Sequence, residues 1–261
     1  MPVITLTSDW NQHDYYLAAV KGYLLQKKGD LQIVDINHNI RPFQVAQAAF
    51  VVRNSYRFFP DGSIHLIFVD AETGKDRSHL AVKADNHYFI AADNGIFSLI
   101  LNDIKGEIIQ LENEEGDQEV TFAGFRTFTN TALGILNNEK FTSLGKKTES
   151  FRESLPLRAT IEQNSITGSI IYVDSYGNVI TNITRELFNR VGKQHMFEIF
   201  VQSKHYTLNK ISQAYNTVPH GELVAVFNSV NLLEIAINKG NASRLLNLNL
   251  NSSIRIEFVS E

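Results

Sequence analysis

Short apolar segments alternate with helical ones in the first part of the chain, and this alternation constrains the fold more than any other feature. Segments 3–8, 31–36 and 64–69 are short and mostly apolar, as in strands that are buried on both faces. Between them, apolar residues recur at helical spacing in segment 15–26 and again from Pro42 onward. The order strand, helix, strand, helix, strand predicts an α/β fold, in which a mostly parallel sheet is flanked by helices.

The rest of the chain predicts a second, smaller domain. We assign residues 1–150 to the N-terminal α/β domain, which also contains a predicted hairpin and two further predicted helices at 79–92, 96–101 and 127–136. Segment 151–168 is rich in charged residues, is broken by Pro156 and shows little periodicity, as is typical of a linker. In residues 169–261, short β-type segments between turn residues predict a C-terminal β-rich domain of barrel or sandwich type.

Composition narrows the possible functions. The formal net charge of -4 does not support nucleic-acid binding through a basic face, and no apolar stretch approaches the ~20 residues that span a bilayer. The chain has no cysteine, which excludes disulfides and thiolate chemistry, and its eight histidines lack metal-ligand spacing. Segment 3–7 begins the chain as a strand and not as a secretion signal. We therefore expect a cytoplasmic protein with no metal, nucleic acid or membrane as a partner.

A carboxylate, Asp70, directly follows the apolar segment 64–69, and an arginine, Arg77, comes after a short loop. In open α/β sheets, ligands bind beyond the carboxyl ends of the strands, so Asp70 and Arg77 are candidates for chemistry. A weak ion pair at the surface is the simpler explanation when this stretch is taken alone. Asp9, at the end of the first predicted strand, is a second such carboxylate, suited to accept two hydrogen bonds from a vicinal diol.

Two stretches of the second half combine polar residues with β-type segments. In segment 174–182, Tyr176 and Asn178 offer a stacking face and an amide suited to a purine or an amino-acid head group. A plain hairpin is a strong alternative explanation of the same stretch. In segment 228–236, polar residues interrupt a β-type run, which favours either a binding edge or an ordinary loop and edge strand. The sequence contains no phosphate-binding P-loop, dinucleotide glycine fingerprint or nucleophile elbow.

Taken together, these stretches resemble the adenosine-forming S-adenosylmethionine (SAM) hydrolases, also called SAM hydroxide adenosyltransferases, which are related to the fluorinating and chlorinating SAM enzymes. The similarity runs in order through segments 4–22, 34–49, 68–77, 92–95, 121–124, 173–183 and 228–242. The resemblance implies a homotrimer with active sites at subunit interfaces. It also implies hydrolysis of SAM to adenosine and L-methionine, through attack of an activated water on ribose C5′. SAM is then the substrate, and no separate cofactor is implied.

The resemblance also implies roles for particular residues. Asp70 and Arg77 match the catalytic pair that orients and polarises water, and Asp9 matches the carboxylate that binds the ribose diol. Tyr176 and Asn178 match residues around the adenine and methionine moieties. The remaining substrate-binding residues that it implies are Trp10, Thr73, Phe122 and Gly124 in the first domain, and Asp174, Ser229 and Glu234 in the second.

The sequence departs from the family pattern at two places. Hydrolytic members typically have histidine where this chain has Ala123, and a Pro-Gly-Val segment where this chain has Ala71, Glu72 and Thr73. Halogenating relatives have a threonine at the position of Thr73, but a carboxylate at Asp70 would repel a halide. Three alternatives follow: a hydrolase that works without the histidine, a catalytically degenerate protein that binds SAM or adenosine, and a halide-using SAM transferase.

Overall fold

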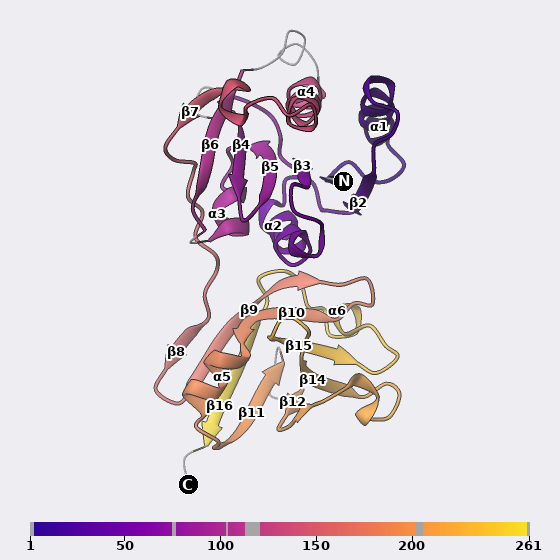
Figure 1. Cartoon of the computed structure of the whole chain (residues 1–261). Helices are drawn as coiled ribbons and strands as arrows, with labels where there is room; N and C mark the ends of the chain where they lie inside the picture. Colours follow the sequence, from indigo (N-terminus) through magenta and orange to yellow (C-terminus); the bar gives the residue numbers. More distant parts are fainter. Residues whose placement is uncertain (1–2, 75–76, 103, 113–120, 202–205, 260–261) are drawn as a thin grey trace. The chain divides into compact units, whose positions relative to one another are not determined.

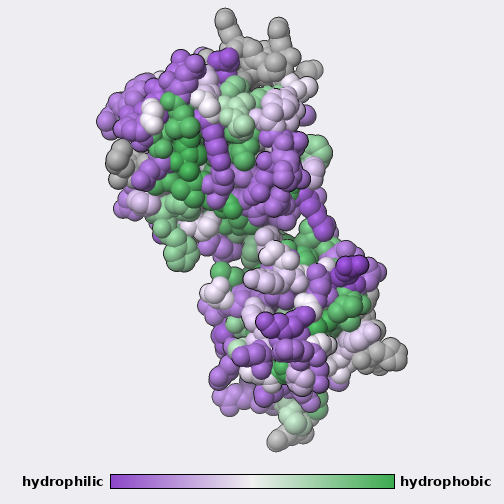
Figure 2. Space-filling view, turned by 90° about the vertical axis from the view of Figure 1, so that its right-hand side faces the viewer, coloured by the Kyte–Doolittle hydropathy of each residue, from purple (hydrophilic) through white to green (hydrophobic). Residues whose placement is uncertain are grey.

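The computed structural model describes residues 3–259 except 75–76, 103, 113–120 and 202–205. The chain forms two compact units, Met1–Leu155 and Pro156–Glu261 (Figure 1). On the face shown in Figure 2, hydrophilic residues cover much of the surface of each unit and hydrophobic residues form separate patches. Within the described ranges, no helix is long and apolar enough to cross a membrane.

The first unit contains a seven-stranded sheet in the order β2-β1-β3-β5-β4-β6-β7. Its strands and α-helices are, in chain order, β1 (Ile4–Ser8), α1 (Tyr15–Lys27), β2 (Ile33–Asn37), α2 (Val45–Arg53), β3 (Ile64–Phe68), β4 (His79–Ala84), β5 (His87–Ala92), α3 (Ile96–Leu101), β6 (Gly106–Leu111), α4 (Phe125–Leu136) and β7 (Lys146–Thr148). Strands β2, β1, β3 and β5 pair in parallel, whereas the pairs β5–β4, β4–β6 and β6–β7 are antiparallel. The predicted α/β class and the predicted hairpin are confirmed.

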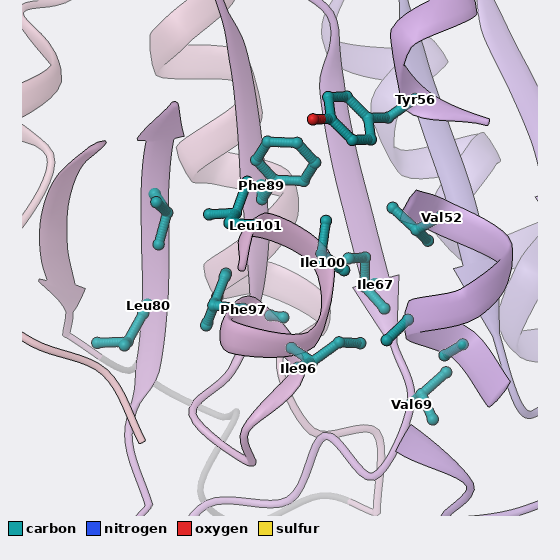
Figure 3. Packing of buried hydrophobic residues seen from close by; sticks show 14 of the residues in the cluster. Val52, Tyr56, Ile67, Val69, Leu80, Phe89, Ile96, Phe97, Ile100 and Leu101 are labelled. Carbon is teal, nitrogen blue, oxygen red and sulfur yellow. The ribbon is translucent and has the colours of Figure 1, made fainter. Parts of the chain in front are cut away.

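Helices cover both faces of this sheet, and β1 and β3 are buried throughout, as their apolar segments predicted. The same prediction is wrong for β2, which lies at the edge of the sheet and has no buried residue. Along β3, Ile64, Leu66 and Phe68 belong to the core formed with α1 and α4. Ile67 and Val69 belong to the opposite core, formed with α2 and α3 (Figure 3). This alternation follows from the pleat of a strand, which sends successive side chains to opposite faces. A strand that must be apolar on both faces is held firmly, and its carboxyl end is a rigid platform for polar residues.

One predicted helix boundary is wrong. The second helix was expected to begin at Pro42, but α2 begins at Val45. The reason is Phe43, whose backbone is left-handed with a φ of +65° and cannot join a right-handed helix. The backbone N–H of Phe43 instead donates a hydrogen bond to the side chain of Asp9, which directly follows β1.

The second unit is a curved, nearly barrel-shaped β-sheet, which confirms the predicted β-rich class. Its strands and α-helices are β8 (Thr160–Glu162), β9 (Ser165–Val173), β10 (Val179–Thr184), α5 (Arg185–Gly192), β11 (Met196–Val201), β12 (Thr207–Leu208), β13 (Ile211–Ser212), β14 (Leu223–Phe227), β15 (Leu232–Ile237), α6 (Ala242–Leu245) and β16 (Ser253–Val259). The sheet has the order β12-β11-β16-β9-β10-β15-β14-β13, and β8 pairs with β9. Its apolar side chains form a core of their own.

A buried polar row crosses the parallel strands of the first unit near their amino ends. Thr5 Oγ1 lies 2.7 Å from His65 Nδ1, and His65 Nε2 lies 3.1 Å from His87 Nδ1. The rings of Tyr56 and Phe89 pack around the two histidines. Burial, with a smaller contribution from His87, lowers the pKa of His65 to about 3. His65 is therefore neutral in the folded protein at physiological pH.

This row predicts a loss of stability in mild acid. The unfolded chain protonates His65 near its ordinary pKa of about 6.5 and the folded chain does so only near 3, so the unfolded state binds more protons between these values. The free energy of unfolding should therefore fall as pH drops through this window, by at most ~1.4 kcal/mol per pH unit for this group. Urea midpoints at pH 7.5, 5.5 and 4.5 measure the effect. The substitution His65→Gln should flatten the pH dependence, and an unchanged slope would contradict the assignment.

Candidate active site

The topology of the first unit singles out one edge of its sheet. The chain passes from β1 through α1 to β2 on one side of β1, and then through α2 to β3 on the other side. In sheets of this kind, such a reversal opens a crevice beyond the carboxyl ends of the two central strands. Asp9 follows directly on β1, and Asp70 follows β3 after Val69. The fold therefore brings two predicted site residues to the edge where α/β sheets bind ligands.

The carboxylate of Asp9 ties together separate backbone segments at this edge. Its Oδ2 accepts the backbone N–H of Phe43 at 2.9 Å and that of Asp70 at 3.3 Å. The backbone N–H of Asp9 donates to the carbonyl oxygen of Phe68 at 3.3 Å. Both side-chain bonds end on one oxygen, and a carboxylate offers about four acceptor positions. Asp9 is therefore fixed in place and keeps acceptor capacity for a ligand hydroxyl.

A network of side chain contacts holds Ser8, the last residue of β1, in place. Ser8 Oγ lies 2.7 Å from His38 Nδ1, and His38 Nε2 lies 3.2 Å from Asp35 Oδ1, which in turn pairs with Lys21. Burial lowers the pKa of His38 in spite of the neighbouring Asp35. The order serine, histidine, aspartate is that of a hydrolase triad, but Ser8 is completely buried and no substrate can reach it. The network is a support for Asp9.

Asp70 and Arg77 form the ion pair that the sequence suggested. Arg77 Nη1 donates to Asp70 Oδ1 at 2.9 Å. The side chains of Asp70 and Arg77 are only 21% and 28% exposed, respectively. A fully solvated pair, which was the simpler explanation from sequence, would be far more exposed and energetically weak. The partly buried pair beyond the carboxyl end of β3 is instead suited to hold and polarise a water molecule.

The backbone of Asp70 is held in an uncommon conformation. Its φ of +46° is left-handed, a conformation that costs on the order of 1–3 kcal/mol and persists only where the surroundings impose it. Arg77 Nη1 also reaches the carbonyl oxygen of Asp70 at 3.3 Å, and the Asn94 amide reaches the same oxygen at 3.1 Å. His79 Nε2 lies 2.8 Å from the carbonyl oxygen of Ala71. Strain of this kind, maintained by several neighbours, concentrates at functional sites.

Thr73 belongs to the same turn. Gly74 and Arg77 pair through both of their backbone groups, at 3.0 and 3.3 Å, so the loop returns on itself. The carbonyl oxygen of Glu72 accepts a hydrogen bond from Arg77 Nη1 at 3.4 Å, and the residue Glu72 is exposed. Thr73 is half-buried. The turn therefore brings Thr73 and Glu72 next to the Asp70–Arg77 pair.

Aromatic rings form an apolar wall at this edge. The ring of Trp10 lies 4.7 Å from that of Phe68 at the end of β3, and 5.0 Å from that of Phe122. Tyr16, in the first turn of α1, contacts both Trp10 and Phe122. The predicted residues Trp10 and Phe122 are thus brought together. Tyr16 lies in segment 4–22, which carries part of the family resemblance, but it was not among the predicted site residues.

The segment before α4 closes the wall. Gly124 has a φ of +77°, and a Cβ atom there would lie 2.9 Å from the ring of Phe128, so the position needs glycine. The ring of Phe128 in turn packs against Phe68 and His79. Ala123 is half-buried between Phe122 and Gly124. Ala123, where the resemblance implies a histidine, therefore lies between Phe122, whose ring packs against Trp10, and Gly124, which lies close to the ring of Phe128.

The second group of predicted residues lies in the second unit, at the turn between β9 and β10. Asp174 Oδ1 accepts the backbone N–H groups of Tyr176 and Asn178 at 2.9 and 2.8 Å, and its Oδ2 accepts from the Asn178 side chain at 3.0 Å. Gly177 has a φ of +82°, and a Cβ atom there would lie 2.1 Å from the side chain of Asn241. The local hairpin is confirmed. Asp174 organises this turn, while the ring of Tyr176 is 76% exposed.

This turn forms one wall of a cavity of about 810 Å³. A volume of this size lies within the range of small-molecule binding sites, which is ~300–1,000 Å³. Asp174, Tyr176 and Asn178 line it together with Tyr215 and Asn238. The structure thus brings three predicted residues to one cavity, and adds Tyr215, which the sequence analysis did not identify.

Glu234 stands behind this cavity and does not line it. Its side chain is 3% exposed, and its two oxygens accept from the hydroxyl of Tyr215 at 2.7 Å and from Asn228 Nδ2 at 3.1 Å. Burial and the bond to Glu234 raise the pKa of Tyr215, which stays a neutral donor. Asn228 shapes the exposed turn that carries Ser229, by accepting the N–H groups of Val230 and Leu232. Glu234 therefore fixes the positions of the Tyr215 hydroxyl and the Asn228 side chain.

Two layers of evidence now define the class of protein. The fold is an α/β unit with two aspartates, Asp9 and Asp70, at its topological switch point, followed by a β-rich unit with a ligand-sized cavity. Models of the SAM hydroxide adenosyltransferase N-terminal and C-terminal domains match residues 4–145 and 168–255. The chain therefore belongs to the SAM hydroxide adenosyltransferase family.

Individual relatives agree with this assignment. The chain is 28% identical to a protein of Methanocaldococcus jannaschii named (R)-S-adenosyl-L-methionine hydrolase, over 99% of this chain and 97% of the relative. It is 25% identical to a fluorinase of Actinoplanes sp., over 73% and 74% of the two chains. A crystal structure of a conserved protein from Thermotoga maritima superposes with a TM-score of 0.85 at 27% identity, over 97% of this chain and 99% of that one.

Proposed function

We propose that this protein hydrolyses S-adenosyl-L-methionine to adenosine and L-methionine. The observation that carries the proposal is the Asp70–Arg77 pair, held beside Asp9 at the carboxyl ends of β1 and β3. Membership in the SAM hydroxide adenosyltransferase family supports the same reaction, as does the similarity along nearly the whole chain to a relative named as a SAM hydrolase. SAM is the substrate, and no separate cofactor takes part.

The chemistry needs little from the protein beyond positioning and proton transfer. The water oxygen forms a bond to ribose C5′, the C5′–S bond breaks with its electron pair going to sulfur, and one water proton is released. Because the leaving thioether is neutral, holding water in line with the sulfonium is the main task, worth ~7–11 kcal/mol. Asp70 accepts the proton, with help from Glu72, and Arg77 orients the water. General-base assistance of this kind contributes about 10²–10⁴-fold.

The other residues bind the two ends of SAM. Asp9 accepts hydrogen bonds from the ribose diol, whose geometry suits one carboxylate. The groups that hold adenine and the methionine moiety are Trp10, Thr73, Phe122 and Gly124 from the first unit, and Tyr176, Asn178, Asp174 and Ser229 from the second, with Glu234 in support. Asp174 accepts hydrogen bonds from the backbone of Tyr176 and Asn178 and so shapes their turn. We assign it a second role, which is to bind the amino-acid end of SAM.

A second candidate function is binding of SAM or adenosine without turnover. The observation that favours it is Ala123, because a methyl group at the position of the family histidine can neither accept nor relay a proton. A third possibility, transfer of a halide to C5′, is opposed by the carboxylate of Asp70, which would repel an anion next to the reacting carbon.

The assembly and location are also part of the proposal. We propose a cytoplasmic homotrimer with active sites at the subunit interfaces. Within the residues that the structure describes, no group of three or more His, Asp or Glu side chains could hold a metal ion. We propose that the enzyme works without a metal, a nucleic acid or a membrane, which suits a net charge of -4.

Product analysis separates these alternatives. Purified protein is incubated with SAM, with and without chloride, and adenosine, methionine and 5′-chloroadenosine are quantified. Equal amounts of adenosine and methionine, independent of chloride, are expected for the hydrolase. Tight SAM binding without products would establish the binding protein instead, and chloride-dependent 5′-chloroadenosine would establish the transferase.

A further inference from the structure

Asn94 follows the carboxyl end of β5, in the turn that leads into α3, and its side chain reaches across to the end of β3. Its Nδ2 donates to the carbonyl oxygens of Val69 at 3.0 Å and of Asp70 at 3.1 Å. Its Oδ1 accepts the backbone N–H of Ile96, the first residue of α3, at 3.2 Å. A single amide thus joins the ends of two parallel strands to the start of a helix.

These bonds fall on the part of the backbone that is hardest to hold. The carbonyl oxygen of Asp70 receives both the Asn94 amide and Arg77 Nη1, while the N–H of Asp70 donates to Asp9. With its N–H and carbonyl both committed, Asp70 is kept in its left-handed conformation, with φ at +46°. That conformation directs its carboxylate to Arg77 at 2.9 Å.

We infer that Asn94 is a positioning residue for the water-activating pair, an inference that rests on the proposed function. Asn94 acts through Asp70: it holds two successive carbonyl groups so that the Asp70 carboxylate stays against Arg77. This task needs a side chain that donates two hydrogens, as the amide N–H₂ group does, because both partners are acceptors. Two further anchors, Arg77 and His79, hold the same turn from the other side.

The substitution Asn94→Asp tests the inference with almost no change of shape. At pH 7.5 the introduced carboxylate cannot donate and repels both carbonyl oxygens, so Asp70 should move away from Arg77. A displacement of about 1 Å at such a pair costs about 10²-fold, and we expect kcat to fall by ~10–100-fold. The Kd for adenosine should stay within about 2-fold, because Asp9 keeps its bond to the N–H of Phe43 and the apolar wall is unchanged.

The pH profile distinguishes positioning from a general loss of structure. When the introduced carboxyl group is protonated, it regains an O–H donor for one of the two carbonyls. The ratio of variant to wild-type kcat should therefore rise by about 5-fold or more between pH 7.5 and 5.5, as the carboxyl group facing two acceptors takes up its proton. A purely structural role would give a ratio that stays level or falls in acid.

Asn54→Asp is the matched control. Asn54 caps the end of α2 and its Nδ2 also donates to a carbonyl oxygen, that of Phe50, at 2.8 Å. Because α2 leads into β3, Asn54 lies at the amino end of the strands, away from Asp70. This variant loses the same kind of bond and gains the same charge. It should keep wild-type kcat and show no rising ratio in acid.

The outcomes separate this inference from the proposed function. If the wild-type protein releases no adenosine, the proposed function is wrong. The inference is then decided by a crystal structure of the Asn94→Asp variant at pH 7.5. An Asp70–Arg77 contact that has lengthened beyond hydrogen-bond reach supports it, and an unchanged contact overturns it. If wild-type protein is active, full kcat in the variant, or a flat pH ratio, overturns the inference alone.

Discussion

Replacing Asp70 by asparagine should abolish most SAM hydrolysis, with a fall in kcat of about 10²–10⁴-fold, because the water loses its proton acceptor. Asparagine has the same shape and, like aspartate, tolerates a left-handed backbone, so the turn at φ +46° should survive. The Arg77 contact should persist in part, since an amide oxygen still accepts a hydrogen bond. Adenosine and methionine release under saturating SAM measures the loss.

Asp85→Asn is a closely matched control. Asp85 is also left-handed, with a φ of +50°, and its carboxylate also binds an arginine, Arg57 Nε at 2.9 Å. It lies in the hairpin turn that leads into β5, at the amino end of the parallel strands. The variant should lose some stability and no activity. Equal losses of activity in the Asp70 and Asp85 variants would indicate that damage to folding, and not to chemistry, explains both.

Introducing a histidine at position 123, where the resemblance implies one, should raise the rate of hydrolysis, in contrast to the loss expected for Asp70→Asn. In the Ala123→His variant, we expect the hydrolysis rate to rise by about 10-fold, the lower part of what a well-placed general base provides. Ala123 is half-buried and directly follows Phe122 of the aromatic wall, so position 123 adjoins the wall and is partly open to solvent. Initial rates of adenosine formation at saturating SAM measure the gain.

The pH dependence shows whether the introduced imidazole acts as a base. Only the neutral ring can accept a proton, so the gain should be present above its ordinary pKa of about 6.5 and disappear below it. Ala123→Gln is the control, because its side chain is of similar size and does not titrate. An unchanged or lower rate in the histidine variant would mean that this site activates water through other residues and has no use for a base at position 123.

Much of the first unit could be predicted because its signals are local. Strand β3 is apolar at every position except His65, and the turn residues Asp93 to Gly95 mark the end of β5. The position of α2's first residue was missed because the left-handed backbone of Phe43 depends on Asp9, far away in sequence. A bond across the fold overrode a local helix signal at Pro42.

The site was predicted unevenly for the same reason. Asp9, Asp70 and Arg77 stand at strand ends, a position that the pattern of apolar segments already reveals. Asn94 looked like a turn residue, because its partners at Val69 and Asp70 belong to another strand.

Taken by itself, the sequence determined the order of strands and helices, the carboxylates at two strand ends and the membership of a family, because these depend on periodicity and on short motifs. Tertiary structure alone decided whether Asp70…Arg77 was a surface pair. It placed the pair at the switch point, left the side chains only 21% and 28% exposed, and surrounded them with Asp9, Asn94 and His79. Hydrogen bonds between residues distant in sequence fix that geometry, and no local pattern encodes them.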